Sequence, residues 1–232
     1  MGTVYLIPTV LSEGVLAPLP AYLLDAMKAC PVFFVEDERT ARRYLKALWR
    51  ELVIDDQQWF NMKKVDEVAA PFTRLLKEGK NIGIISDAGC PGVADPGQKL
   101  VALAQEIGAP VKPLVGPNSI LLALMASGMN GQQFQFMGYL PINLAERATA
   151  IKALEAESRT KNCTQIFIET PYRNNQLLET LLKTCHPQTR ICVAVDLTAA
   201  TESVQTKTVN GWKKALPELH KRPAIFLLQA AT

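Results

Sequence analysis

The sequence predicts an α/β protein of two domains. Short apolar segments rich in β-branched residues alternate with longer segments of helical character. With 232 residues the chain is long for one such domain and comfortable for two small ones, and its 48% apolar residues can build a sizeable core. We place the domains at residues 1–115 and 116–232, with a helix at about 119–128 bridging them.

The predicted strands are short apolar segments, most of them bounded by turn residues. They are residues 3–7, 32–35, 59–64 (a short strand and loop), 82–85, 111–115, 134–138, 164–168, 190–195 and 224–229. The predicted helices lie between them. They are residues 21–30, 39–52, 67–78, 98–104, 120–126, 145–157, 175–184 and 210–216. Because strands and helices alternate in the first half, we expect a mostly parallel sheet there.

Residues 81–97, NIGIISDAGCPGVADPG, are the strongest local signal for a ligand site. A buried strand leads into a loop with three glycines and two prolines, and a helix follows. Such strand–helix turns hold ligands in α/β sheets because main-chain N–H groups can approach the ligand closely. A second turn, at residues 116–119 (GPNS), repeats the pattern and offers further backbone donors near the same sheet edge.

Two carboxylates in this loop, Asp87 and Asp95, have alternative interpretations. They could bind Mg²⁺ for phosphoryl transfer, but the chain has no GKS or GKT phosphate loop and no third carboxylate close by. We favour capping of backbone N–H groups, with one of the two also facing a ligand. Cys90 is interpreted as a packing residue, because no histidine lies near it in the sequence.

Basic residues share one side of the predicted helix at 39–52. They are Arg39, Arg42, Arg43, Lys46 and Arg50. A solvated helix face and a contact with RNA phosphates both fit this pattern. Glu169 and Arg173, four residues apart after a predicted strand, could form a local ion pair or face a substrate, and the strand end favours the site.

The remaining composition restricts the compartment and the chemistry. Five cysteines without a CxxC pair fit free thiols in a reducing compartment, and two histidines in no ligand-like spacing argue against a zinc site. No signal peptide or membrane-spanning segment is recognisable. We therefore expect a cytoplasmic protein with no metal. A net charge of +3 permits a nucleic-acid partner without requiring one.

The loop at 86–97 resembles the SDAGTP…DPG signature of the bacterial 16S ribosomal RNA cytidine 2′-O-methyltransferases, which belong to the tetrapyrrole methylase superfamily. Further matching segments follow in the family's order over nearly the whole chain. They are Glu36-Asp37 with Arg39 and Thr40, residues 113–117 (PLVGP), 127–128 (SG), 138–141 (GYLP), 169–173 (ETPYR) and 197–198 (LT).

The resemblance implies two α/β domains of the tetrapyrrole methylase type with S-adenosylmethionine in the cleft between them, and a homodimer. It implies that backbone and small residues hold the cofactor. The matching positions are Pro8, Ser86, Asp87, Ala88, Val93, Ser119, Ile120, Ile168, Glu169, Thr170 and Leu197. An RNA substrate would meet basic side chains, for which the candidates are Arg39, Arg42, Arg43 and Arg173.

For methyl transfer to a ribose hydroxyl, a carboxylate would help to align the nucleophile. The candidates are Glu36, Asp37, Glu169 and Glu202. The chain departs from the family on the substrate side: a histidine is missing near residues 61–64, and Ala199 replaces a lysine. A tetrapyrrole methyltransferase of the same fold, a non-catalytic RNA- or cofactor-binding relative, and a metal-dependent phosphohydrolase therefore stay as alternatives.

Overall fold

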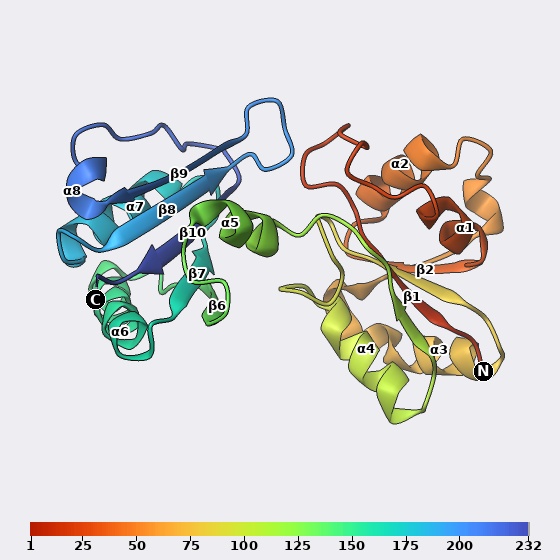
Figure 1. Ribbon diagram of the computed structural model, residues 1–232. Coiled ribbons are helices and arrows are strands. Elements are labelled where there is room, and N and C mark those ends of the chain that lie inside the picture. The colour runs from red at the N-terminus through yellow and green to blue at the C-terminus, as the bar shows by residue number, and fades with distance from the viewer. Residues whose placement is uncertain (232) are drawn as a thin grey trace. The chain divides into compact units, whose positions relative to one another are not determined.

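The computed structural model describes residues 1–231 and divides into two compact units, Met1–Asn118 and Ser119–Thr232 (Figure 1). Each unit contains one five-stranded sheet covered by helices. The α/β class expected from the sequence is confirmed. Within residues 1–231 no helix is both long enough and apolar enough to span a membrane.

The first unit alternates strands and helices throughout. Its elements are β1 (Val4–Ile7), α1 (Leu23–Lys28), β2 (Val32–Val35), α2 (Glu38–Leu48), β3 (Gln58–Asn61), α3 (Val65–Lys77), β4 (Ile82–Ile85), α4 (Gly97–Glu106) and β5 (Val111–Pro113), with short 3-10 turns at Ile54–Asp56 and Met62–Lys64. The sheet order is β3-β2-β4-β1-β5 and every pair is parallel, as the sequence predicts.

Alternate residues of the central strands enter two separate cores. On β2, Val32 and Phe34 pack with α3 and α4, whereas Phe33 and Val35 pack with α1 and α2. Figure 1 shows the two helix pairs on opposite faces of this sheet. Both faces are therefore buried, which explains why the strands read as continuous apolar runs.

The second unit has a mixed sheet. Its elements are α5 (Ser119–Ser127), β6 (Phe134–Tyr139), α6 (Leu144–Lys161), β7 (Thr164–Ile168), α7 (Asn174–Thr184), β8 (Arg190–Val195), β9 (Ser203–Thr208), α8 (Val209–Trp212) and β10 (Ala224–Gln229). The order is β6-β7-β10-β8-β9, and only β6 and β7 run parallel. One face packs with α6, α7 and α8 around Phe167, Phe226 and Trp212. α5 packs against β8, β9 and β10 within this unit.

The structure differs from the sequence-based elements at several ends, among them the helix predicted at 210–216, which ends at Trp212, and three differences have a clear physical reason. The predicted helix 39–52 ends at Leu48; Leu52 is buried from the following turn, which prolonged the apparent periodicity. α6 continues to Lys161, beyond the predicted residue 157, and stops where Asn162 takes a left-handed φ of 47°. β9 was not predicted, because it is a polar edge strand without an apolar run.

Gly83, in the centre of β4, allows a close approach of side chains in the first unit. A Cβ atom at this position would lie 2.8 Å from Phe33 Cδ1 and 2.9 Å from Ile7 Cδ1, and both side chains are fully buried. We expect Gly83→Ala to lower the free energy of unfolding by about 1–3 kcal/mol through overpacking, measured by urea denaturation. Gly131→Ala is the matched control, because nothing lies within 4 Å of its Cβ position. Equal stability of both variants would contradict this packing.

Candidate functional site

The carboxyl ends of the parallel strands in the first unit form one edge, where most of the expected site residues meet. β2 is followed by α2 on one face of the sheet, and β4 is followed by α4 on the other. β2 and β4 are neighbours, and the chain leaves them in opposite directions, from β2 to β3 on one side and from β4 to β5 on the other. This is the topological switch point at which open α/β sheets bind ligands.

The loop at residues 86–97 is fixed to the end of β1. Thr9 donates its N–H to Gly89 O (2.8 Å) and its hydroxyl to Ser86 O (3.3 Å). Asp95 accepts the N–H groups of Gly92 (2.8 Å) and Gly97 (2.7 Å), which confirms the capping interpretation for this carboxylate. Burial raises the pKa of Asp95, against these hydrogen bonds. The loop is thus shaped by the Asp95 carboxylate within it and by hydrogen bonds from Thr9 at the end of β1.

Asp87 and Glu36 bring two carboxylates together at the switch point. The backbone N–H of Asp87 donates to Glu36 Oε1 at 2.9 Å. Burial raises the pKa of Glu36, and the charges of Asp87 and Asp95 add to this effect. Burial also raises the pKa of Asp87, with a further contribution from the charge of Asp37. Each of the two carboxyl groups therefore has a pKa above its own ordinary value.

Asp37, the neighbour of Glu36 in the chain, stabilises a helix terminus. Its carboxylate accepts the Thr40 N–H at 2.8 Å and caps the N-terminus of α2, and this hydrogen bond lowers its pKa. Of these two adjacent carboxylates, Asp37 therefore caps a helix, whereas Glu36 lies at the candidate site.

The second turn lies against the first loop, as the sequence predicts. Cys90 Sγ lies 3.7 Å from Gly116 O and 3.5 Å from Pro117 O, and a Cβ on Gly116 would come within 2.2 Å of Pro8 Cβ. Only glycine fits there. Burial raises the pKa of the Cys90 thiol, so the packing interpretation is preferred over a nucleophilic one.

A pocket of about 500 Å³ opens beside this loop in the first unit. The segment after β1, the helix α2 and the loop after β4 contribute its walls. The lining residues are Val10, Leu11, Glu13, Gly14, Leu16, Thr40, Arg43, Tyr44, Ala47, Asp87 and Ala88. The sequence reasoning did not identify Thr40, Tyr44 or Ala47 as site residues. Tyr44 donates its hydroxyl to Pro8 O at 2.5 Å, which ties α2 to the end of β1.

The basic side of α2 is partly neutralised. Arg42 pairs with Glu38 at 2.6 Å and lies over the Trp59 ring at 5.1 Å. Arg43 pairs with Glu13 at 2.8 Å, with both side chains largely exposed. Arg39 is exposed. A loosely held pair of this kind can exchange its partner for a phosphate, because exposed salt bridges contribute little.

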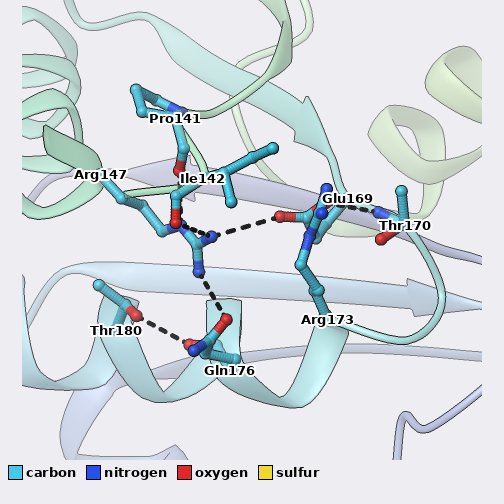
Figure 2. Close-up of polar contacts among 8 residues, drawn as sticks. All are labelled: Pro141, Ile142, Arg147, Glu169, Thr170, Arg173, Gln176 and Thr180. Atoms are coloured by element: carbon cyan, nitrogen blue, oxygen red, sulfur yellow. Dashed lines mark hydrogen bonds and ion pairs between the residues drawn. The ribbon is translucent and has the colours of Figure 1, made fainter. Parts of the chain in front are cut away.

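Glu169 lies at the end of β7 in the second unit, between two guanidinium groups (Figure 2). It pairs with Arg173 at 2.7 Å and with Arg147 at 3.7 Å, and it accepts the Thr170 N–H at 2.7 Å. Burial acts to raise the pKa of Glu169, but the hydrogen bonds and both positive charges lower it below its ordinary value. The ion-pair interpretation of Glu169 and Arg173 is confirmed.

Arg147 is a further residue that the sequence reasoning did not identify. Its side chain is fully buried and donates to Pro141 O (2.8 Å) and Ile142 O (3.0 Å), so it joins the turn before α6 to the end of β7 (Figure 2). One signal was available. Arg147 shares the buried side of α6 with Ile151 and Leu154, where an arginine requires a charged partner.

The ends of β7 and β8 flank the start of β10, since both strands are antiparallel to it. This places Ile168, Thr170 and Leu197 along one edge of the second sheet. Glu202 Oε2 accepts the Thr198 N–H at 2.6 Å and holds the loop after β8. The other expected cofactor positions of this unit, Ser119 and Ile120, begin α5. Among residues 1–231, no group of three His, Cys, Asp or Glu side chains is placed to hold a metal.

A parallel sheet whose carboxyl edge carries a glycine-rich loop and carboxylates, as in the first unit, is typical of enzymes that bind a ligand at that edge. The chain belongs to the tetrapyrrole (corrin/porphyrin) methylase family, whose model matches residues 17–211. The family expected from the SDAG…DPG residues, and with it the methyltransferase class, is thereby confirmed.

The chain is similar to proteins of known name in sequence and in fold. The chain is 30% identical to ribosomal RNA small subunit methyltransferase I of Escherichia coli O157:H7, over 98% of this chain and 78% of that protein. It is 31% identical to the protein of that name from Bacillus subtilis, over 91% and 70%. The uroporphyrin-III C-methyl transferase of Thermus thermophilus, solved with S-adenyl homocysteine, has the same fold: TM-score 0.60, 18% identity, 98% and 97% covered.

We expect Glu169→Gln to destabilise the protein by about 3–5 kcal/mol, because it leaves Arg147 buried without a countercharge. Thermal unfolding would measure the loss. Glu179→Gln is the matched control, since its pair with Lys183 is exposed, and it should change stability by less than about 0.5 kcal/mol.

The lowered pKa of Glu169 also gives the direction of the pH dependence. Its ionised form contributes stability above its ordinary value of 4.5, and this contribution is lost as pH falls through the lower value in the folded state. The Gln variant should therefore lose less stability than the parent protein on acidification. If the parent protein and the Gln variant lost equal stability as the pH falls, the ion pairs of Glu169 would contribute nothing.

Proposed function

We propose that this protein is an S-adenosylmethionine-dependent methyltransferase that acts on a ribose 2′-hydroxyl of ribosomal RNA. The observation that carries the proposal is the loop at residues 86–97 with its neighbouring Glu36–Asp87 pair, because it combines a ligand-binding turn with a proton acceptor. The names of the relatives at about 30% identity support ribosomal RNA as the substrate. We further propose that the protein is a homodimer and acts in the cytoplasm.

The residues at the carboxyl edge fit the proposed cofactor. S-adenosylmethionine carries positive charge on its sulfonium and ammonium groups, and Glu36 and Asp87 place negative charge at the edge. Val93 is 44% exposed and offers an apolar surface for a purine ring. The proposed cofactor positions are Pro8, Ser86, Asp87, Ala88 and Val93 in the first unit, and Ser119, Ile120, Ile168, Glu169, Thr170 and Leu197 in the second. When bound, the cofactor supplies a methyl group on a sulfonium centre.

Among the four candidate carboxylates, Glu36 is the proposed base. Asp37 caps α2, Glu169 is enclosed by two guanidinium groups, and Glu202 holds the Thr198 N–H. Glu36 is half-buried and lies at the switch point beside Asp87, and its ionised form can accept the proton of the RNA hydroxyl. Arg39, Arg42, Arg43 and Arg173 are the proposed phosphate contacts.

Transfer of a tritiated methyl group to purified ribosomal subunits tests the function. Incorporation into ribose of the small subunit RNA supports the proposal. Incorporation only into a porphyrin precursor would move the substrate to the tetrapyrrole branch of the family. Cofactor binding without transfer to any RNA or porphyrin would indicate a non-catalytic relative.

We expect Asp87→Asn to weaken S-adenosylhomocysteine binding by about tenfold or more, because a charge-assisted contact contributes about 1.5–3 kcal/mol. Calorimetric titration measures the dissociation constant. Asparagine keeps an acceptor for neighbouring N–H groups, so the loop is preserved. Asp66→Asn on α3 is the matched control and should bind as the parent protein does. Unchanged affinity in a folded Asp87 variant would remove Asp87 from the site.

We expect Glu36→Gln to lower the rate of methyl transfer by about 10²–10⁴-fold, the usual contribution of a general base. In the parent protein, the rate should fall as the pH drops through the pKa of Glu36, which lies above the ordinary 4.5, because protonation removes the acceptor. Single-turnover rates over a pH series measure this. A variant that keeps both the rate and its acidic limb would exclude Glu36 as the base.

A further inference from the structure

We propose that Arg222 is a positioning residue for the cofactor, because it holds the loop at residues 196–202 in a strained backbone conformation. This loop joins β8 to β9, whose flanking residues Val195 and Ser203 are paired. It carries Leu197, one of the proposed cofactor positions of the second unit. The inference rests on the proposed function and adds to it a residue from the segment before β10.

Two residues of the loop have a left-handed backbone although neither is a glycine. The φ angle is 49° at Asp196 and 72° at Thr198. Aspartate enters this region more readily than most residues, whereas a β-branched threonine is an outlier there. Among the described residues, the buried Thr198 hydroxyl has no hydrogen-bond partner either. The conformation of Thr198 is therefore unfavourable by itself and persists because other contacts hold it.

Leu197 lies between these two residues, so their φ angles set the direction of its backbone groups. Its side chain is buried, with 8% exposed, and a ligand at this position would therefore meet mainly its backbone. One peptide unit contains both the C=O of Leu197 and the N–H of Thr198. If Thr198 relaxed to a negative φ, this peptide unit would turn and the proposed cofactor position would change.

Arg222 fixes both ends of the loop with one guanidinium group. Its Nε and Nη2 atoms donate to Asp196 Oδ2 at 2.9 and 2.8 Å, and Nη2 also donates to Thr201 O at 3.0 Å. Thr201 in turn donates its hydroxyl to the same Asp196 oxygen at 2.9 Å. The third nitrogen, Nη1, donates to Glu218 O at 3.3 Å and thereby anchors the arginine itself.

A contact inside the loop acts on the strained peptide unit directly. Glu202 Oε2 accepts the Thr198 N–H at 2.6 Å. This contact depends on the fixed distance between the two halves of the loop, which Arg222 sets. The ion pair is suited to this task because the side chains of Arg222 and Asp196 are only 33% and 14% exposed, so solvent screens it less than a fully exposed pair.

Replacement of Arg222 by glutamine is the first test, with S-adenosylhomocysteine as the probe. We expect Arg222→Gln to weaken binding by at least about tenfold, because only the fraction of molecules that keeps the strained loop can bind. The Thr198 amide should also exchange its hydrogen faster, as measured by nuclear magnetic resonance. Arg159→Gln is the matched control and should bind as the parent protein does, since Arg159 is an exposed arginine of the same unit that donates to Ala231 O.

Replacement of Thr198 by glycine separates positioning from a general effect on stability. Glycine adopts a φ of 72° without strain, so Thr198→Gly should bind within about twofold of the parent protein. In the Arg222→Gln background it should restore most of the lost affinity. A merely structural role of Arg222 predicts a lower melting temperature with an unchanged dissociation constant, and no rescue by glycine.

Unchanged affinity in a folded Arg222→Gln variant, or absence of rescue by Thr198→Gly, would overturn the inference. Far-ultraviolet circular dichroism verifies folding. If Arg222→Gln does not fold, Arg222→Lys gives the same comparison, because lysine keeps the charge but cannot bond both ends of the loop with a planar fork. Failure of the proposed function gives a different result: the parent protein itself would not bind S-adenosylhomocysteine, although the Thr198 amide would still exchange faster in the Arg222 variant.

Discussion

Burial of the parallel sheet on both faces is the constraint from which the site of the first unit follows. Side chains of β2 and β4 enter two cores, so neither face is left for a ligand. Parallel direction then collects the carboxyl ends of all five strands at one edge. Loops that leave this edge toward opposite faces bring the carboxylates of Glu36 and Asp87 together, although 51 positions separate them in the chain.

The candidate site residues of the second unit are held by ion pairs, whereas the main loop of the first unit is held largely by hydrogen bonds to backbone groups. Its edge at the end of β7 is organised by Glu169, which is matched by Arg147 from α6 and Arg173 from α7 (Figure 2). A buried carboxylate with two partners specifies one arrangement of three segments, because any other arrangement leaves a charge unpaired. The backbone at Thr170 is held by the same carboxylate. The two edges are therefore held in place by different kinds of interaction, ion pairs in the second unit and hydrogen bonds to backbone groups in the first.

The sequence predicts the parts of this protein that depend on local pattern. The apolar runs at 32–35 and 82–85 identify the central strands, and the glycines after β4 identify the main loop. The individual side-chain contacts between distant segments were not predictable. Asp37 and Glu36 are equivalent in sequence, but only the structure separates the helix cap from the site carboxylate. The pocket, the partner of Arg147 and the polar edge strand β9 likewise depend on tertiary packing.

The place of β1 has a consequence for synthesis on the ribosome. β1 pairs with β4 on one side and β5 on the other, so the first strand to be made lies inside the sheet and receives its partners last. At about 5–20 residues per second, several seconds pass before residues 82–85 and 111–113 emerge. During this interval an apolar strand has both edges open. The sheet of the first unit therefore cannot close around β1 until residues 82–113 are available to pair with it.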